Sequence, residues 1–214
     1  MSIIKSKEYK EEQARRTLHY ICDFSLENWE HLDGPDLQNS IDSYGIEVVQ
    51  DLPKNEQKMT RFVETVWDKL YSEIDEQKVG EFERLGGSFM IENEKIHVAS
   101  LGERPNAPEH LIGTIKKKID LLNTGGYRHF EQYDLYVFVG TTLVDENFPS
   151  HVQQVIEQVS SYQDSKKLKY GTLYLDQLYV MCICDLKKKS FEWKEISKEI
   201  RDRVHQETKE LWSN

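Results

Sequence analysis

Two carboxylates in residues 33–50 could act together on a metal ion. Asp36 follows a proline at a turn, and Glu47 lies inside an apolar segment, residues 44–49, that is predicted to be a strand. A carboxylate buried in such a strand is costly unless water, a cationic side chain or a bound cation compensates its charge. Two carboxylates on adjacent strands can converge on one Mg²⁺, which prefers oxygen ligands and can activate a water against a phosphodiester.

The spacing of these residues resembles the signature of the PD-(D/E)XK nuclease superfamily. Pro35-Asp36 is followed, after a short gap, by Ile46-Glu47-Val48-Val49-Gln50. The layout of residues 7–140, with one helix before the motif and a long helix after it, is also similar to that family's core. The resemblance implies a restriction-endonuclease-like three-layer α/β fold, in which helices flank a central mixed sheet.

The resemblance also implies roles for particular residues. Asp36 and Glu47 would be the ligands of a Mg²⁺ or Mn²⁺ ion, and a lysine two residues after the glutamate would position the attacking water. This chain has Val49 in the lysine position. Gln50 could supply the missing polar group and is the third candidate catalytic residue, although strand alternation directs it to the face opposite Glu47 unless a bulge intervenes.

The valine at position 49 is compatible with two more arrangements. A lysine from a different element could take the place of the motif lysine, and the best candidates lie in Lys116-Lys117-Lys118. Alternatively, the site is inactive. The family often adds an acidic residue from its first helix, and Glu12 is the candidate here.

Both acids also have an ordinary structural interpretation. An aspartate before a loop commonly caps backbone N–H groups, so Asp36 could be a turn residue. Glu47 could pair with a lysine or arginine across the sheet. In that case the chain is an α/β domain without a metal site.

Three lysine clusters could contact phosphate groups. They are Lys116–Lys118, Lys166-Lys167 and Lys187–Lys189. Each is more often a solvated surface, because lysine keeps its ammonium group in water. Together they could still form a local basic patch for nucleic acid.

The remaining chemistry-bearing residues form no recognised site. No two histidines have the spacing of a zinc site on one helix, and no Cys-x₂-Cys pair occurs. Cys182 and Cys184 lie on one face of a predicted buried strand, where core packing explains them. The sequence also lacks the glycine-rich phosphate loop, the dinucleotide fingerprint and the Gly-x-Ser-x-Gly motif.

Hydrophobic periodicity predicts the elements that must position these residues. We expect helices over residues 7–22, from Pro53 to about Ile74, from Pro105 to Leu122, over 150–162 and over 193–212. We expect strands over 44–49, 135–139 and 178–184, and a hairpin of 88–92 with 95–101. The apolar runs 135–139 and 178–184 indicate central strands. We expect one nuclease-like domain over residues 1–192 and a C-terminal helical extension over 193–214.

Composition limits the function classes. The chain has 214 residues, and 28 basic against 38 acidic side chains give a net charge of −10. This balance argues against a general nucleic-acid coat but allows a small basic groove. No apolar stretch reaches the length of a membrane span or resembles a signal peptide, and three cysteines are too few for a disulfide framework. We therefore expect a cytoplasmic protein without membrane contact.

Two functions follow as hypotheses. The first is a Mg²⁺- or Mn²⁺-dependent nuclease that cleaves DNA phosphodiester bonds, in the setting of phage–host conflict. The second is a catalytically inactive module on the same scaffold that regulates or inhibits a protein partner, as Val49 and the acidic balance suggest. The sequence leaves the substrate form and the oligomeric state open.

Overall fold

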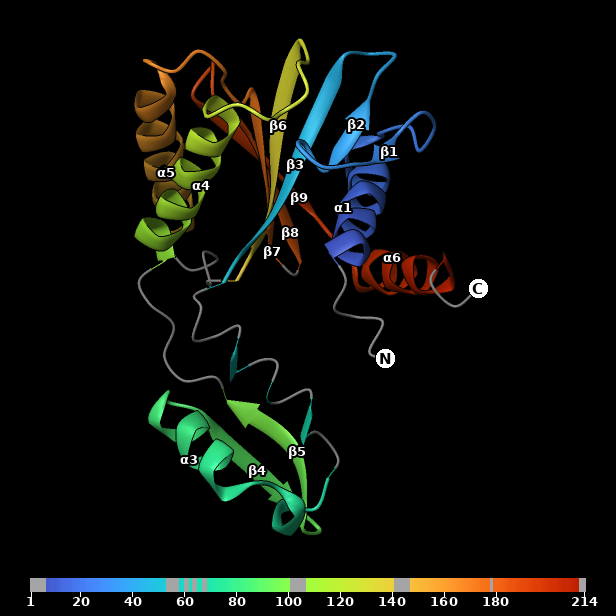
Figure 1. Cartoon of the computed structure of the whole chain (residues 1–214), viewed down its shortest axis with the longest axis vertical. Helices are drawn as coiled ribbons and strands as arrows, with labels where there is room; N and C mark the ends of the chain where they lie inside the picture. The colour runs from blue at the N-terminus through green and yellow to red at the C-terminus, as the bar shows by residue number, and fades with distance from the viewer. Residues whose placement is uncertain are drawn as a thin grey trace.

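The chain is built around one mixed β-sheet, seen in a computed structural model (Figure 1). The structure describes residues 7–52, 58–59, 62, 65–66, 69–100, 107–140, 147–177 and 179–211. The strands of the main sheet are β1 (Glu30–His31), β2 (Leu37–Asn39), β3 (Tyr44–Asp51), β6 (Gln132–Val139), β7 (Thr172–Gln177), β8 (Val180–Asp185) and β9 (Ser190–Glu195). They lie in the order β1-β2-β3-β6-β7-β8-β9.

The centre of the sheet is parallel and its two sides are antiparallel. Strand β6 lies between β3 and β7 and runs parallel to both, whereas β1 with β2 and β8 with β9 continue the sheet as antiparallel pairs. Five consecutive residues of β6 are buried, as expected for a strand covered on both faces. The predicted central position of residues 135–139 is therefore confirmed.

Helices cover both faces of this sheet, so the fold is α/β (Figure 1). The described helices are α1 (Lys7–Cys22), α3 (Glu76–Arg84), α4 (Ala107–Asn123), α5 (Phe148–Gln163) and α6 (Lys198–Leu211). Helices α4 and α5 pack on the face that carries Leu135 and Val137 of β6. Helix α1 packs on the other face, against Ile46 and Tyr136, and α6 packs against α1.

A second, smaller unit is inserted between β3 and α4. It contains α3 and a two-stranded sheet of β4 (Ser88–Glu92) and β5 (Lys95–Ser100). The hairpin turn falls at Asn93 and Glu94, as predicted, and both residues have positive φ, as a type I′ turn requires. The Phe82 ring of α3 stacks on Phe89 of β4 at 4.6 Å between ring centroids.

Several element boundaries differ from the sequence predictions. The helix expected up to Ile74 ends earlier: Met59, Phe62 and Val66 are helical, but Leu70 forms an isolated bridge to Lys95 and a 3-10 turn follows. Position 63 of that predicted stripe lies outside the described residues. Strand β7 was not anticipated, because Asp176 interrupts its apolar pattern.

The C-terminal helix also starts later than predicted. Residue 193 lies in β9, and α6 begins only at Lys198. The boundary expected between residues 192 and 193 therefore falls inside a strand of the main sheet. Strand β9 contains several charged residues, and this composition is the reason that the sequence predicted a helix there. None of the described helices combines the length and apolar character needed to cross a membrane.

Candidate functional site

Strands β2 and β3 bring Asp36 and Glu47 to one place. Leu37 of β2 pairs with Ile46 of β3, so Asp36, one residue before β2, lies beside Glu47. The Asp36 Oδ2 atom accepts a hydrogen bond of 2.8 Å from the backbone N–H of Val48. Asp36 is 2% exposed and Glu47 is 4% exposed. The sequence prediction that these two acids meet is consistent with this arrangement.

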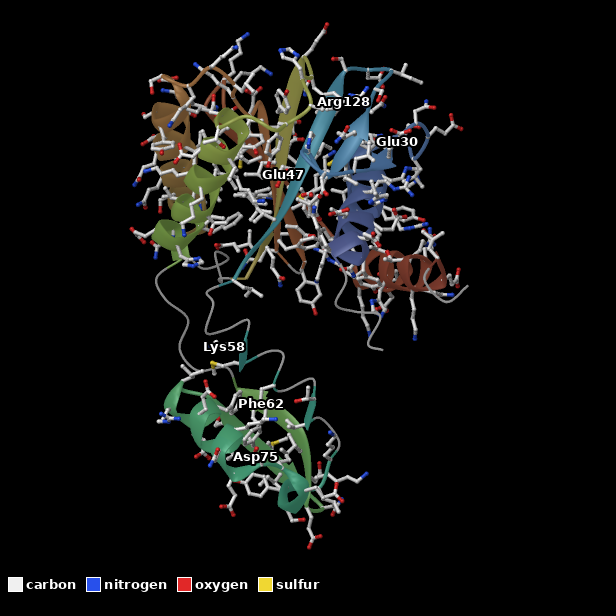
Figure 2. All side chains as sticks on the ribbon, viewed as in Figure 1. Glu30, Glu47, Lys58, Phe62, Asp75 and Arg128 are labelled. Carbon is white, nitrogen blue, oxygen red and sulfur yellow. The ribbon has the colours of Figure 1, made fainter. Side chains whose placement is uncertain are left out.

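A lysine reaches Glu47 from helix α4. The Lys118 Nζ atom lies 2.5 Å from Oε1 of Glu47, and Glu47 is labelled on the main sheet in the upper half of Figure 2. Of the three candidate lysines, only Lys118 has this position: Lys116 lies over the Tyr162 ring, and Lys117 is exposed. An ammonium group therefore stands beside the carboxylate although Val49 occupies the motif position.

The charge of Glu47 is incompletely compensated. Burial raises the pKa of Glu47, and the negative charge of Asp36 raises it further, whereas Lys118 and the Tyr127 hydroxyl act in the opposite direction. The other carboxylate oxygen, Oε2, is buried and has no hydrogen-bond partner among the described residues. A buried, unpaired carboxylate oxygen favours a further cation or donor at this point.

Asp36 has its own ammonium partner. The Lys7 Nζ atom lies 2.8 Å from Asp36 Oδ1, 2.7 Å from Asp33 Oδ1 and 3.6 Å from Glu11 Oε1. Partial burial lowers the pKa of Lys7, but the hydrogen bonds to Asp33 and Asp36 and the charges of Asp36 and Glu11 outweigh it, so the pKa is raised. Lys7 thus stands among three carboxylates.

The first helix contributes Glu11 rather than Glu12 to this neighbourhood. Glu12 bonds to Arg15 and Arg16 at 2.7 Å and to His31 at 3.0 Å. Burial raises the pKa of Glu12, but these partners lower it to about 2. Glu12 is therefore held by the two arginines and by His31, whose other ring nitrogen lies 3.4 Å from Glu11 Oε2. Glu11 Oε1, in contrast, is buried without a hydrogen-bond partner among the described residues and faces Lys7.

Gln50 does not join the carboxylates. It is exposed, and the pairing of β3 with β6 continues without a shift from Tyr44 to Asp51, so no bulge reverses its direction. Its side chain therefore lies on the face opposite Glu47. Val49 shares the Glu47 face and packs against the core beneath α4. Of the alternatives that the sequence left open, a lysine from a different element is the one whose required position beside Glu47 is occupied, by Lys118.

A second polar contact between β3 and α4 was not predicted from the sequence. Asp51 is fully buried, and its Oδ1 atom lies 2.7 Å from both Nδ1 of His110 and Oγ1 of Thr114. His110, Thr114 and Lys118 are four residues apart, so they occupy one side of α4. The same spacing separates Glu47 from Asp51 on β3. This shared four-residue spacing in α4 and β3 was the feature of the sequence from which the contact could have been predicted.

The described residues contain no cluster of three or more His, Cys, Asp or Glu side chains arranged as a metal site. Asp36 and Glu47 are a pair. Mg²⁺ commonly binds through one or two carboxylates and keeps several waters, so a pair can suffice. The unpaired Oε2 atom of Glu47 is the observation in favour of such an ion at this position.

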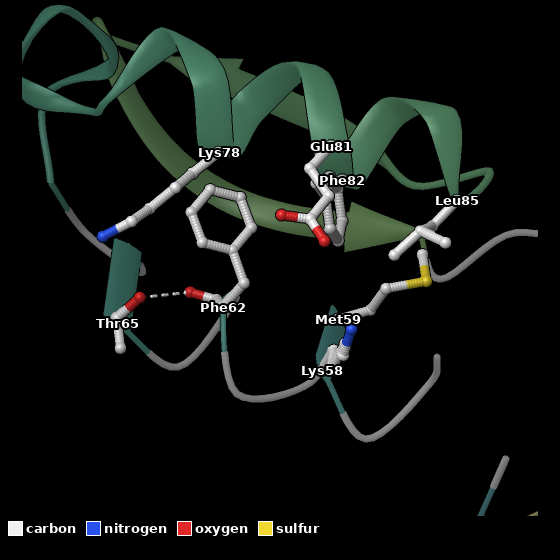
Figure 3. Close-up of a pocket in the computed structure, with 8 residues that line it drawn as sticks. All are labelled: Lys58, Met59, Phe62, Thr65, Lys78, Glu81, Phe82 and Leu85. Carbon is white, nitrogen blue, oxygen red and sulfur yellow. Dashed lines mark hydrogen bonds between the residues drawn. The ribbon is translucent and has the colours of Figure 1, made fainter. Parts of the chain in front are cut away.

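The other basic clusters and a pocket in the inserted unit lie away from Glu47. Lys166 pairs with Asp120 at 2.7 Å, and Lys188 pairs with Asp185 at 3.0 Å, so these lysines are partly neutralised. A pocket of about 460 Å³ in the inserted unit has an apolar lining that includes Phe62 and Phe82 (Figure 3). It contains none of the residues around Glu47.

Comparison of the chain with protein-family models, with curated proteins and with solved structures finds no match in any of the three.

Proposed function

We propose that the protein is a metal-dependent hydrolase of DNA phosphodiester bonds with a restriction-endonuclease-like fold. The observation that carries this proposal is the meeting of two buried carboxylates, Asp36 and Glu47, next to the ammonium group of Lys118. Carboxylates that share a divalent cation, with a lysine beside them, are the groups that this chemistry requires.

The arrangement of the elements supports the proposal. Helix α1 precedes the β2–β3 hairpin, α4 follows it, and β6 then lies parallel to β3. This order is similar to the core implied by the PD-(D/E)XK resemblance. Asp36 lies immediately before β2 and Glu47 lies within β3, where the motif would have its acids.

Asp36 and Glu47 would hold a Mg²⁺ or Mn²⁺ ion through Asp36 Oδ1 and the unpaired Oε2 of Glu47. The bound ion would polarise the phosphodiester and lower the pKa of a coordinated water. Lys118 would supply the positive charge that the motif lysine provides, and it could hold a phosphate oxygen or orient the water. The backbone N–H of Val48 fixes the Asp36 carboxylate through Oδ2.

A second candidate function is a non-catalytic module that binds a protein partner. Its supporting observation is that each acid already has a lysine counter-ion: Lys7 for Asp36 and Lys118 for Glu47. Ion pairs of this kind also occur in structural clusters without any catalysis. In this interpretation the lysines permanently neutralise the acids.

Cleavage of plasmid DNA and of single-stranded oligonucleotides, with Mg²⁺ or Mn²⁺ against EDTA, tests the first function. We expect metal-dependent cleavage that falls at least about 100-fold in Asp36→Asn, Glu47→Gln and Lys118→Met, because each removes charge at the reacting phosphate. Glu157→Gln is the matched control, since Glu157 is exposed on α5. Circular dichroism would verify that each variant is folded.

Two results would count against the nuclease. Cleavage that persists in Asp36→Asn and Glu47→Gln would exclude these residues as the ligands. Absence of cleavage by the purified wild-type protein with either metal, together with absence of Mn²⁺ binding, would favour the non-catalytic module.

A further inference from the structure

Lys7 is placed where a divalent cation would compete with it. Its ammonium group contacts Asp33, Asp36 and Glu11, which come from the turn before β2 and from α1 itself. The Oδ1 atom of Asp36 is the atom that Lys7 contacts, at 2.8 Å, and it is also the oxygen of Asp36 that the Val48 N–H leaves available. The Oδ1 atom of Asp36 therefore cannot pair closely with the Lys7 ammonium group and coordinate a divalent cation at the same time.

The burial of the partners shows which group can leave. The side chains of Asp36 and Glu11 are 3% and 4% exposed, whereas the Lys7 side chain is 59% exposed and belongs to the first residue of α1. A lysine side chain has a flexible stem, so Lys7 can turn towards water without movement of the sheet. Asp33, with a side chain 96% exposed, offers a partner that Lys7 can keep on the solvent side.

The second lysine differs in this respect. Lys118 is 22% exposed and reaches Glu47 from the middle of α4, beneath which the core is packed. Lys118 is therefore the better fixed of the two ammonium groups, and Lys7 is the exchangeable one.

We propose that Lys7 is a resident counter-ion that a divalent metal must displace from Asp36, so that the first turn of α1 sets the metal affinity of the site. This inference rests on the proposed function, because it assumes that Asp36 and Glu47 hold the metal. Competition between two cations for one carboxylate is a coupling free energy, and it acts equally in both directions.

Mn²⁺ binding to the full-length, metal-free protein tests the inference, with free Mn²⁺ measured by electron paramagnetic resonance. Lys7→Met removes the competing charge and keeps the length of the side chain, so we expect tighter Mn²⁺ binding, by about 5- to 150-fold as for other coupled sites. Lys7→Arg keeps the charge and should bind Mn²⁺ no more tightly than wild type. Lys187→Met is the control, because Lys187 is an exposed residue between β8 and β9.

Thermal unfolding gives a second readout. Without metal, Lys7→Met should unfold at a lower temperature than wild type, because buried carboxylates lose a counter-ion. Saturating Mn²⁺ should raise the unfolding temperature of Lys7→Met by more than that of wild type, since a tighter ligand stabilises more at equal concentration.

The outcomes separate this inference from the proposed function. If wild type, Lys7→Met and Lys187→Met bind Mn²⁺ equally, and the binding is lost in Glu47→Gln, the metal site stands and the role of Lys7 is overturned. If none of them binds Mn²⁺, both proposals fail. If Lys7→Met does not fold even with Mn²⁺ present, whereas Lys7→Arg folds, Lys7 is a structural counter-ion and the exchange is overturned.

Discussion

Two buried carboxylate clusters in the same sheet differ in how fully their oxygens are satisfied. Asp176 of β7 is 4% exposed, and both of its oxygens accept hydrogen bonds from the guanidinium of Arg201. The hydroxyl of Tyr136 donates to it as well. A bidentate arginine with an added hydroxyl donor satisfies this carboxylate within the protein.

The cluster of Asp36 and Glu47 is built in the opposite way. Each acid is approached by a lysine, which is a point charge on a flexible stem, and the two acids repel one another. Oxygens of Glu47 and of the neighbouring Glu11 are buried without hydrogen-bond partners among the described residues. Burial of an acid alone therefore does not distinguish the two clusters, whereas unsatisfied carboxylate oxygens beside a second acid do.

The largest effect that we expect is a difference in stability between variants of the two clusters. Asp176→Asn leaves the guanidinium of Arg201 without its carboxylate, and we expect a loss of about 3–5 kcal/mol in the free energy of unfolding. Glu47→Gln removes a repulsion with Asp36, and the amide oxygen of the glutamine can still accept a hydrogen bond from Lys118. We therefore expect its cost to stay below about 1 kcal/mol. Urea unfolding of both variants in EDTA measures the difference.

Equal losses of unfolding free energy in the two variants would show that the two clusters do not differ in how well their carboxylates are satisfied. In that case Glu47 and Lys118 would form a structural ion pair of the same kind as Asp176 and Arg201. The gentler substitution Asp176→Glu, which keeps the charge, would show whether geometry or charge is responsible in the first cluster.

A third buried acid sharpens the comparison through pH. Asp134 is fully buried and lacks a cationic partner among the described residues, but it accepts hydrogen bonds from the Tyr44 hydroxyl and, at 2.8 Å, from the Thr172 N–H. Burial raises the pKa of Asp134 above the unfolded value of 3.8, although these donors act against the shift. An acid with a raised pKa contributes stability that is fully present below the unfolded pKa and is lost as pH rises through the folded pKa.

The Asp134→Asn variant cannot ionise, and its amide can keep the acceptor for Thr172. Its stability relative to wild type should therefore increase steadily as the pH rises from the unfolded pKa of the carboxyl towards neutrality. Thermal unfolding across this pH range measures the trend, with Glu157→Gln as the control because Glu157 is exposed on α5. A difference that does not change with pH would mean that the hydrogen bonds, rather than burial, govern Asp134.

Much of the candidate site was predictable because it depends on local pattern. The turn after Pro35, the apolar strand around Glu47 and the stripe of Leu111, Ile115 and Ile119 on α4 each set local structure directly. Lys118 lies at the edge of that stripe, three residues after Ile115. Helical phase alone could therefore have distinguished it from the exposed Lys117.

Other features depend on long-range packing that local pattern does not reveal. Glu11 and Glu12 are adjacent in sequence and both contact His31, but only the packing of α1 on the sheet directs Glu11 to Lys7, whereas Glu12 pairs with the arginines. The sequence alone did not reveal the partners of Lys7, because they depend on where the turn before β2 lies in the fold. The inserted unit with α3 was also not expected as a separate body, since its aromatic residues are equally typical of a single core.

The most direct test is whether Asp36 and Glu47 jointly hold a divalent ion. Mn²⁺ binding should be measured by electron paramagnetic resonance on wild type, Asp36→Asn, Glu47→Gln and the control Glu157→Gln, each verified as folded. We predict Mn²⁺ binding in wild type and in the control, and its loss in both Asp36→Asn and Glu47→Gln. Binding that is unchanged in these two variants, or absent from the wild-type protein, would contradict a shared metal site.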